Sequence, residues 1–587
     1  MNDVWNLDTV YTSFDDPRFE ADLAEGKQKI EAFTALTASL TGREPLEALK
    51  EGILLQEDIS LLAQKLGMYA SLLQYADSRN TEAQSQLGRL MGIFSTLAAP
   101  EAAFQEWAAN LPDLMEIVES DELLQQYHFL FTKMKEHSRY LLGSRGEEIM
   151  AKMELSGSNA WADLHTSLTS TVPVNYRGKI INLPSVRNLA FDPDPQVRKD
   201  AFEAELQCYE AIKEPVAFAL NSIKLETLSD CELRGYQSPL DRTLKESDMS
   251  RATLDAMLGA MDEYLPHFWK YLKTKAKALG HENGLPWYDL AAPMGNSSTR
   301  FTTRQARDYL VEQFASFDQA LSDLVARAFD ESWIDFFPRD GKSGGAFCEM
   351  VQCRKESRIL TNFDGMFTDV ITLAHELGHA FHNHCVFPHR PLNQDYSMPV
   401  AETASIFNEC IINAAALKNA ADDAERLAIL ESSLHDTTQI ICDIYSRFRF
   451  EAKVFAQRGE QFMNADALCA IMVDAQKQSY GDGLDHSCLH PYMWINKSHY
   501  YGPTFYNFPY AFGGLFARGL YAQYLEEGRN FIPKYKKLLY TTPIATAEDA
   551  AKVAGVDLTD KHFWRAALQT IADEIQWFCD LAEHATV

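Results

Sequence analysis

Five consecutive residues near the middle of the chain have the types and the spacing of a metal-dependent hydrolytic centre. They are His375, Glu376, Leu377, Gly378 and His379. On a helix, positions i and i+4 lie one turn apart on one face, so the two imidazoles could share a Zn²⁺ ion at ~2.0–2.1 Å. Glu376 is rotated by about 100° around the helix and would lie beside the metal, where it suits a base for water. The pattern predicts a zinc metallopeptidase.

The sequence around this motif favours a functional interpretation. The segment TDVITLAHELGHAFHNH is apolar and contains few helix breakers, so it is typical of a helix. A chance match of three fixed positions in such a chain has a probability on the order of a few per cent. Chance matches usually fall in loops or charged surface helices. Two histidines and a glutamate in an apolar helix need a reason to be buried there.

A zinc site needs a third protein ligand, which the motif does not supply. One class of zinc peptidases would require Gly at position 382 and His at position 385. This chain has His382 and Cys385, so that class is excluded. The candidates further along are Asp395, Glu402 and Glu409. His382 is a local competitor, although one helix rarely supplies three ligands, and a supporting or core role suits it better.

Two of these carboxylates lie on a second helical stretch, PVAETASIFNECIINAAALKNA. Glu402 follows His379 after enough residues for a loop and a return to the metal. Glu409 lies seven residues further and faces the same way on a helix. One carboxylate can therefore bind the metal while the other supports a ligand histidine through its free ring nitrogen.

An aromatic segment near the end of the chain could stabilise a transition state. Residues 498–517 read SHYYGPTFYNFPYAFGGLFA. Peptide hydrolysis passes through a tetrahedral oxyanion, which a phenol or an imidazole opposite the metal would stabilise. The alternative is that these aromatic side chains only build the core.

The elements that must position these residues are mainly helices. Residues 15–165 have the period of successive amphipathic helices. The period breaks at 171–184, where β-branched residues around Arg177-Gly178 predict a short hairpin. A second β-like region spans 344–363. We expect a boundary between lobes near 185–195.

Length and charge exclude several classes of function. The chain of 587 residues is too long for one core and fits two or three lobes. Its formal charge of −29 repels phosphate backbones and anionic lipids, so we expect neither nucleic-acid nor membrane binding. The N-terminus resembles no signal peptide, and we find no apolar stretch that could span a bilayer. The 10 cysteines are irregularly spaced, which predicts free thiols in a reducing cytoplasm.

Three motifs together resemble a known family. HELGHAFH, AETASIFNE and HYYGPTFYNFPYAFGGLFA are similar in order and spacing to the oligoendopeptidase F branch of the thimet-oligopeptidase-like zinc metallopeptidases. The resemblance is strong from about 190 to 575. It is weaker in the helical N-terminal region. Three ordered motifs are far more specific than the pentapeptide alone.

The resemblance implies a role for each residue of the candidate centre. It implies His375, His379 and Glu402 as zinc ligands, with one zinc ion per chain. It also implies Glu376 as the general base and a supporting role for Glu409.

The resemblance further implies residues that contact the substrate. His499, Tyr506 and Tyr510 would contact the substrate or the oxyanion, and which tyrosine acts is left open because the branches of the family differ in spacing. The segment GKSGGAFC resembles the substrate-side strand of the family, so an extended peptide could bind along its edge through backbone hydrogen bonds. The strand residues are Gly344, Gly345, Ala346 and Phe347.

The fold implied by the resemblance is mainly α: a multi-helical, two-lobed metallopeptidase with a deep central channel and a small β-sheet near the active site. Residues 1–188 would form an N-terminal helical region and residues 189–587 the zinc peptidase catalytic domain. Such a channel admits short unstructured oligopeptides. We expect a cytoplasmic monomer or small homo-oligomer.

The predicted function is a zinc-dependent endopeptidase that hydrolyses internal bonds of short oligopeptides. Two alternatives are a metallocarboxypeptidase on a similar scaffold and a non-catalytic, zinc-containing peptide-binding protein. The metallocarboxypeptidase would need a group that binds the terminal carboxylate of its substrate, and we find no motif that indicates such a group. The intact Glu376 argues against the second, since a structural zinc site has no use for a base.

Overall fold

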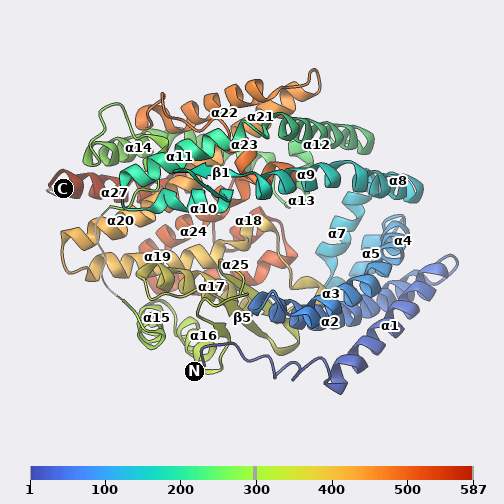
Figure 1. Ribbon diagram of the computed structural model, residues 1–587. Coiled ribbons are helices and arrows are strands. Elements are labelled where there is room, and N and C mark those ends of the chain that lie inside the picture. The colour runs from blue at the N-terminus through green and yellow to red at the C-terminus, as the bar shows by residue number, and fades with distance from the viewer. Residues whose placement is uncertain (1, 295–299, 585–587) are drawn as a thin grey trace.

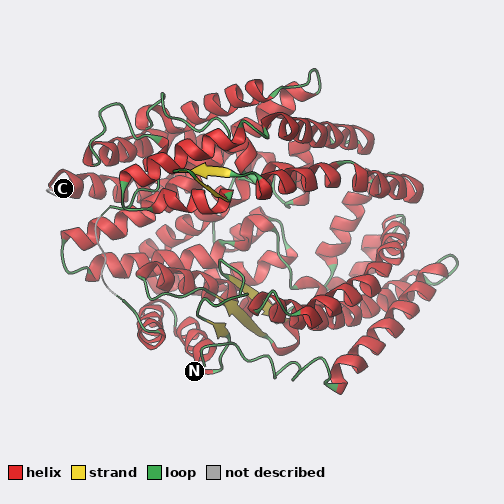
Figure 2. Cartoon of the chain, in the orientation of Figure 1, coloured by secondary structure: helices red, strands yellow, loops and turns green. Residues whose placement is uncertain are grey.

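Helices dominate the computed structural model, which describes residues 2–294 and 300–584 (Figure 2). The helices form two groups, drawn one above the other in Figure 1, and the strands are few and short. This arrangement confirms the predicted mainly α, multi-helical class. Among the described residues, none of the helices combines the length and the apolar character that a membrane span requires.

The N-terminal helices are short to medium in length, apart from two long ones at the start. They are α1 (Pro17–Ala38), α2 (Pro45–Ala76), α3 (Thr81–Phe94), α4 (Ala98–Ala109), α5 (Leu114–Glu119), α6 (Glu122–Gln125), α7 (His128–His137), α8 (Gly143–Ser156) and α9 (Ser158–Thr171). The helices of the middle segment are α10 (Leu183–Asn188), α11 (Pro195–Tyr209), α12 (Lys213–Arg234), α13 (Pro239–Glu246), α14 (Arg251–Ala278), α15 (Thr303–Phe317) and α16 (Gln319–Asp330).

The C-terminal segment carries the motif helix and the helices that surround it. They are α17 (Phe367–Val386), α18 (Met398–Ala401), α19 (Thr403–Asn419), α20 (Asp423–Thr438), α21 (Ile444–Arg458), α22 (Ala465–Tyr480), α23 (Met493–Asn496), α24 (Phe508–Glu527), α25 (Ile532–Thr541), α26 (Ala547–Val553) and α27 (Lys561–His584). A π-helical turn, Gln439–Asp443, joins α20 to α21.

The strands form two small sheets. β1 (Val174–Tyr176) and β2 (Lys179–Ile181) form the predicted hairpin, and Arg177 and Gly178 at its turn have φ of +51° and +81°. The second sheet has the order β3-β5-β4. β5 (Glu356–Leu360) lies at its centre, parallel to β3 (Ile334–Asp335) and antiparallel to β4 (Phe347–Val351). The two-residue β3 was not predicted, because it is too short to carry a period.

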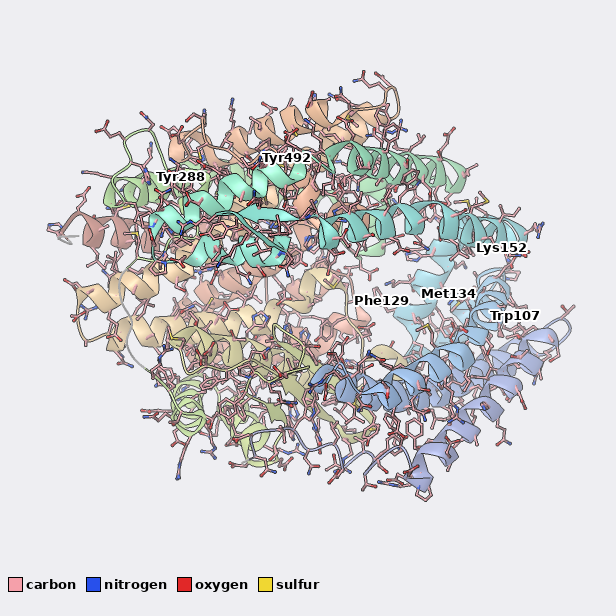
Figure 3. The ribbon with its side chains drawn as sticks, in the orientation of Figure 1. Trp107, Phe129, Met134, Lys152, Tyr288 and Tyr492 are labelled. Atoms are coloured by element: carbon pink, nitrogen blue, oxygen red, sulfur yellow. The ribbon has the colours of Figure 1, made fainter. Side chains whose placement is uncertain are left out.

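The N-terminal helices contribute to both groups. Tyr11 and Phe19 share a hydrophobic cluster with Val351 and Leu360 of the second sheet. After α7, which runs between the two groups, α9 packs against α12 in the other group (Figure 1). Figure 3 labels Phe129 on α7, the helix that makes this crossing. The first part of the chain therefore contacts both groups.

Start signals in the sequence fix the beginnings of several helices. Asp194 caps α11 by accepting a hydrogen bond from the backbone nitrogen of Gln196 at 2.9 Å, and Pro195 occupies the first turn. Asp369 binds the backbone nitrogens of Asp364 and Met366 at 2.9 Å and so closes the start of the motif helix. Since the free backbone donors of a helix start need partners, these contacts set where the helix begins.

Candidate metal centre

The motif helix α17 crosses α19 in backbone contact. A Cβ atom at Gly378 would lie 2.5 Å from both the carbonyl oxygen of Ala404 and the Cα of Ser405. Real Cβ atoms do not approach backbone so closely, so only glycine permits this crossing. The contact brings Glu402, just before α19, close to the two histidines of the motif.

Three donor atoms from the two helices come together at this crossing. His375 Nε2 lies 3.1 Å from His379 Nε2 and 3.3 Å from Glu402 Oε2, and His379 Nε2 lies 3.6 Å from Glu402 Oε2. Ligand atoms of a tetrahedral zinc site with bonds of ~2.0–2.1 Å lie about 3.3 Å apart. Two imidazoles and a carboxylate are also ligands that zinc prefers. These residues therefore fit a zinc ion in both chemistry and spacing.

Glu402 is held in place from two sides. It lies at the junction of α18 and α19, and its Oε2 accepts a hydrogen bond from Ser405 Oγ at 2.7 Å. A Cβ at Gly513 of α24 would lie 2.8 Å from the Cβ of Glu402, so α24 also packs closely against it. Burial alone would raise the pKa of Glu402, but His375 and His379 outweigh it and lower that pKa to about 2. Glu402 is therefore an anionic donor.

Glu409 supports the first histidine. Its Oε1 lies 2.5 Å from His375 Nδ1, so it accepts that ring N–H and leaves Nε2 free toward Glu402. This is the relationship predicted for one of the two carboxylates on the second helical stretch.

Glu376 lies beside the donor group and has an unused oxygen. Its side chain is buried, and Oε2 has no hydrogen-bond partner within the described part of the chain. Burial raises the pKa of Glu376 to about 7. A carboxyl group with such a pKa can both accept and release a proton near neutral pH.

Two other candidate ligands lie outside the donor group. His382 is fully buried, stacks on Tyr396 with ring centroids 3.9 Å apart, and places Nε2 2.8 Å from Thr542 Oγ1. It therefore serves the core, the role that the sequence analysis favoured. Asp395 is exposed, and the group of donor atoms within 4.8 Å of one another comprises His375, His379 and Glu402.

His499, Tyr506 and Tyr510 form one cluster. The ring of Tyr506 lies 5.6 Å from that of His499 and 5.5 Å from that of Tyr510, between centroids. Tyr510 lies in the first turn of α24, and Gly513 of the same helix contacts Glu402. Burial, followed by the hydrogen bond with Tyr506, raises the pKa of Tyr510, so its phenol keeps its proton. The cluster thus brings the protonated phenol of Tyr510 to the side of Glu402 where α24 packs.

A buried ion pair that the sequence analysis missed supports this cluster. Lys224 Nζ lies 2.6 Å from Glu451 Oε1, and both side chains are almost fully buried. Glu451 also accepts hydrogen bonds from the backbone nitrogen of Phe505 at 3.2 Å and from Asn507 Nδ2 at 2.8 Å. In the sequence, this pair is visible only as a lysine and a glutamate within two apolar helical segments. Since the two residues lie far apart in the chain, no local pattern predicts that they pair.

The strand predicted to bind substrate lies at a sheet edge. β4 pairs with β5 alone among the described strands, and Gly344 and Gly345 before it are exposed. The ring of Phe347 packs against Tyr75, with centroids 4.9 Å apart, so its side chain belongs to the packing of the N-terminal helices. Ala346 is half-buried. The backbone of the segment is therefore exposed at Gly344 and Gly345, while the Phe347 side chain is engaged in packing.

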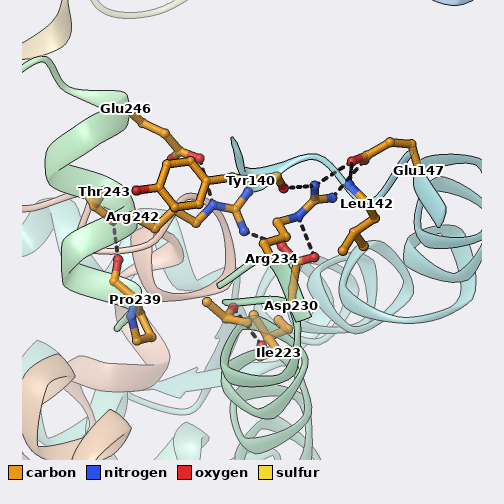
Figure 4. A network of polar contacts seen from close by, with 11 residues as sticks. Tyr140, Leu142, Glu147, Ile223, Asp230, Arg234, Pro239, Arg242, Thr243 and Glu246 are labelled. Atoms are coloured by element: carbon orange, nitrogen blue, oxygen red, sulfur yellow. Dashed lines mark hydrogen bonds and ion pairs between the residues drawn. The ribbon is translucent and has the colours of Figure 1, made fainter. Parts of the chain in front are cut away.

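A cavity of about 590 Å³ lies over the Tyr506 loop. Its far wall contains an ion network that joins α8, α12 and α13 (Figure 4). In this network Arg234 contacts Glu147 and Asp230, each at 2.7 Å, and Arg242 contacts Asp230 at 2.6 Å. These pairs fix the helices opposite the tyrosines.

The fold and the donor group together define a class, the metal-dependent peptidases. A family model described as "Peptidase family M3" matches residues 188–570, and one described as "Oligopeptidase F" matches residues 97–172. The chain belongs to peptidase family M3, a family of metallopeptidases that act on oligopeptides.

Relatives in both sequence and structure agree with this assignment. The chain is 23% identical to "Oligopeptidase PepF" of Bacillus subtilis, covering 98% of this chain and 86% of the relative. It is 25% identical to "Group B oligopeptidase PepB" of Streptococcus agalactiae, covering 97% and 96%. The fold matches the crystal structure of oligoendopeptidase-F from Enterococcus faecium with a TM-score of 0.73 at 17% identity, covering 97% of this chain and 100% of that one. The fold also matches the "Crystal structure of putative peptidase from Chlamydophila abortus" with a TM-score of 0.85 at 20% identity, covering 99% of this chain and 98% of that one.

Proposed function

We propose that this peptidase is a zinc-dependent endopeptidase that cleaves internal bonds of short oligopeptides. The observation that carries the proposal is the spacing of the donors of His375, His379 and Glu402, 3.1 to 3.6 Å apart, together with the unpartnered oxygen of Glu376 beside them. A bound zinc ion would supply a Lewis acid for the scissile carbonyl and the attacking water. The names of the relatives support oligopeptides as substrates.

Glu376 would act as the general base and then as the general acid. Its free Oε2 would take a proton from the attacking water and pass it to the leaving amine. Burial raises the pKa of Glu376, which favours a carboxyl group that takes up a proton and returns it. Glu409 would hold His375 in the tautomer and orientation that present Nε2.

The remaining residues would hold the substrate and its oxyanion. Tyr506, Tyr510 and His499 would donate hydrogen bonds to the oxygen that becomes negative in the tetrahedral intermediate. An extended peptide would add its backbone beside Gly344 and Gly345, just before the edge strand β4, as in strand addition to a sheet.

A mixed peptide library with mass-spectrometric readout tests the proposal. We expect internal cleavage of short peptides, loss of cleavage after a chelator, and recovery when zinc is added. Folded proteins should resist. Release of C-terminal residues alone would instead indicate a carboxypeptidase, and cleavage that persists after complete removal of metal would refute the zinc assignment.

A further inference from the structure

A second cavity, of about 530 Å³, lies beside His375. Thr368, Ile371, Thr372 and His375 line it, and their spacing of three and four residues places them on one face of α17. The volume lies in the range of small-ligand sites. Because His375 is also a candidate metal ligand, the cavity adjoins the metal centre in the direction of the N-terminus of α17.

The walls of this cavity are mostly apolar. They come from α17, α19, α20 and α24, which lie around one another in Figure 1. The apolar side chains are Phe367, Ile406, Ile429, Ile440 and Leu515. Burial of hydrocarbon against such walls is favourable, so the body of a ligand here is an apolar chain.

One acidic side chain in the cavity has no protein partner. Asp436 lines the cavity and is accessible to solvent, and no described side chain forms a hydrogen bond or an ion pair with its carboxyl group. Partial desolvation by the surrounding protein, together with the charges of Glu409 and Glu431, raises the pKa of Asp436 to about 7. A cation at this position would relieve that unfavourable environment.

The other charged groups of the cavity are already engaged. Arg518 lies 3.2 Å from Glu574 and donates a hydrogen bond to Thr437 Oγ1 at 3.1 Å. Glu409 is bound to His375. Glu425 accepts the backbone N–H of Ala421 at 2.8 Å. The charge that remains unpaired among the described residues of the cavity is therefore negative: Asp436 has no partner, and Glu425 has only this backbone hydrogen bond.

We propose that this cavity is a side-chain subsite that takes a lysine or arginine of the substrate next to the cleaved bond. The alkyl stem would lie along the apolar walls and the cationic head would pair with Asp436. Because His375 lines the cavity, a substrate side chain bound there would lie beside the metal centre and hence near the bond that is cleaved. The inference rests on the proposed peptidase function and adds a preference for basic substrates.

Binding to an inactive protein tests the subsite without turnover. For each position near the expected bond we would prepare a pair of peptides that carry lysine or norleucine at that position and are otherwise identical. Each peptide would be titrated calorimetrically into metal-loaded Glu376→Gln protein. Norleucine has the same carbon chain as lysine and lacks the charge. We expect the lysine peptide to bind about 10-fold more tightly or better at one position. Adding Asp436→Asn should abolish the difference and leave the norleucine affinity unchanged.

Asp423→Asn is the matched control, because it removes the same charge from the exposed start of α20, outside the cavity. That variant should keep the lysine preference. The proposal would be overturned if the Glu376→Gln protein bound both peptides with equal affinity. It would also be overturned if Asp436→Asn lowered the affinity for both peptides equally. Binding of free hexylamine at Asp436 without any lysine preference would overturn it as well. A wild-type protein that cuts neither peptide would refute the peptidase proposal, while the binding difference would still decide the subsite.

Discussion

Glu451 accepts a hydrogen bond from the backbone nitrogen of Phe505 at 3.2 Å, and Phe505 has a φ of +52°. A non-glycine residue in this left-handed region costs about 1–3 kcal/mol, so its surroundings must hold it there. The same carboxylate binds the side chain of Asn507, which caps α24. Glu451 therefore fixes the backbone on both sides of Tyr506.

We expect Glu451→Gln to lower kcat by about 10²-fold, the effect of misplacing a catalytic group by about 1 Å. Metal content should not change, because α17 and α19 are not touched. KM should change less than kcat if the loop acts mainly on the transition state. The measurement is kcat and KM on one fluorogenic peptide, with metal analysis of the same sample.

The Glu451 variant also leaves Lys224 buried without its partner, a loss of about 3–5 kcal/mol in stability. The double variant with Lys224→Met removes that charge and should recover most of the Tm. Its kcat should stay low. A double variant that regains wild-type kcat would show that Glu451 acts only through stability.

Gly378→Ala should release the metal. The added Cβ would meet the backbone of Ala404 and Ser405 at 2.5 Å, so α17 and α19 must separate and carry Glu402 away from the histidines. We expect lower zinc content and a lower Tm. Gly88→Ala is the control, because α3 has open space at that position. It should be neutral, or stabilise by about 0.5–1 kcal/mol. Full zinc occupancy in the Gly378 variant would contradict this account of the crossing.

Alanine variants of Glu402 and His382 should show which of the two residues is the third zinc ligand. Glu402→Ala should lose zinc, because two imidazoles alone leave the site incomplete. His382→Ala should keep zinc and lose stability, by about 3 kcal/mol or more for a buried stacked ring. Elemental analysis after desalting, beside thermal unfolding, measures both. Zinc loss in the His382 variant with retention in the Glu402 variant would reverse the assignment.

Glu376→Gln should keep zinc and lose turnover. The amide has the shape of the carboxyl but cannot accept the proton from water, so kcat should fall by about 10²–10⁴-fold or more. Peptide affinity should change little. Near-wild-type kcat in the metal-loaded variant would exclude Glu376 as the base.

Tyr506→Phe and Tyr510→Phe should distinguish the two phenols. Loss of an oxyanion donor should lower kcat by about 10²–10³-fold with little effect on zinc content. Because the rings contact each other, only one of the two needs to show the full effect. Unchanged kcat in both variants would mean that the cluster is structural.

Several features could be predicted from the sequence because they depend on local geometry. The helix period alone brings His375 and His379 together, since residues four apart lie on one face. The β-branched residues around Arg177 and Gly178 predicted the first hairpin. The spacing of Glu402 and Glu409 predicted that both lie on one helix face, one to bind the metal and the other to support a ligand histidine. It left open which carboxylate approaches the two imidazoles.

Only the tertiary structure decided how distant elements meet. The backbone contact of Gly378 with Ala404 selects Glu402 over Asp395, because helix crossing depends on the packing of both helices. Three other features likewise join segments that share no local pattern. They are the hydrogen bond between Glu451 and Phe505, the ion pair of Glu451 with Lys224, and the cavity at Asp436. Such contacts arise from the packing of the whole chain, which no window of sequence contains.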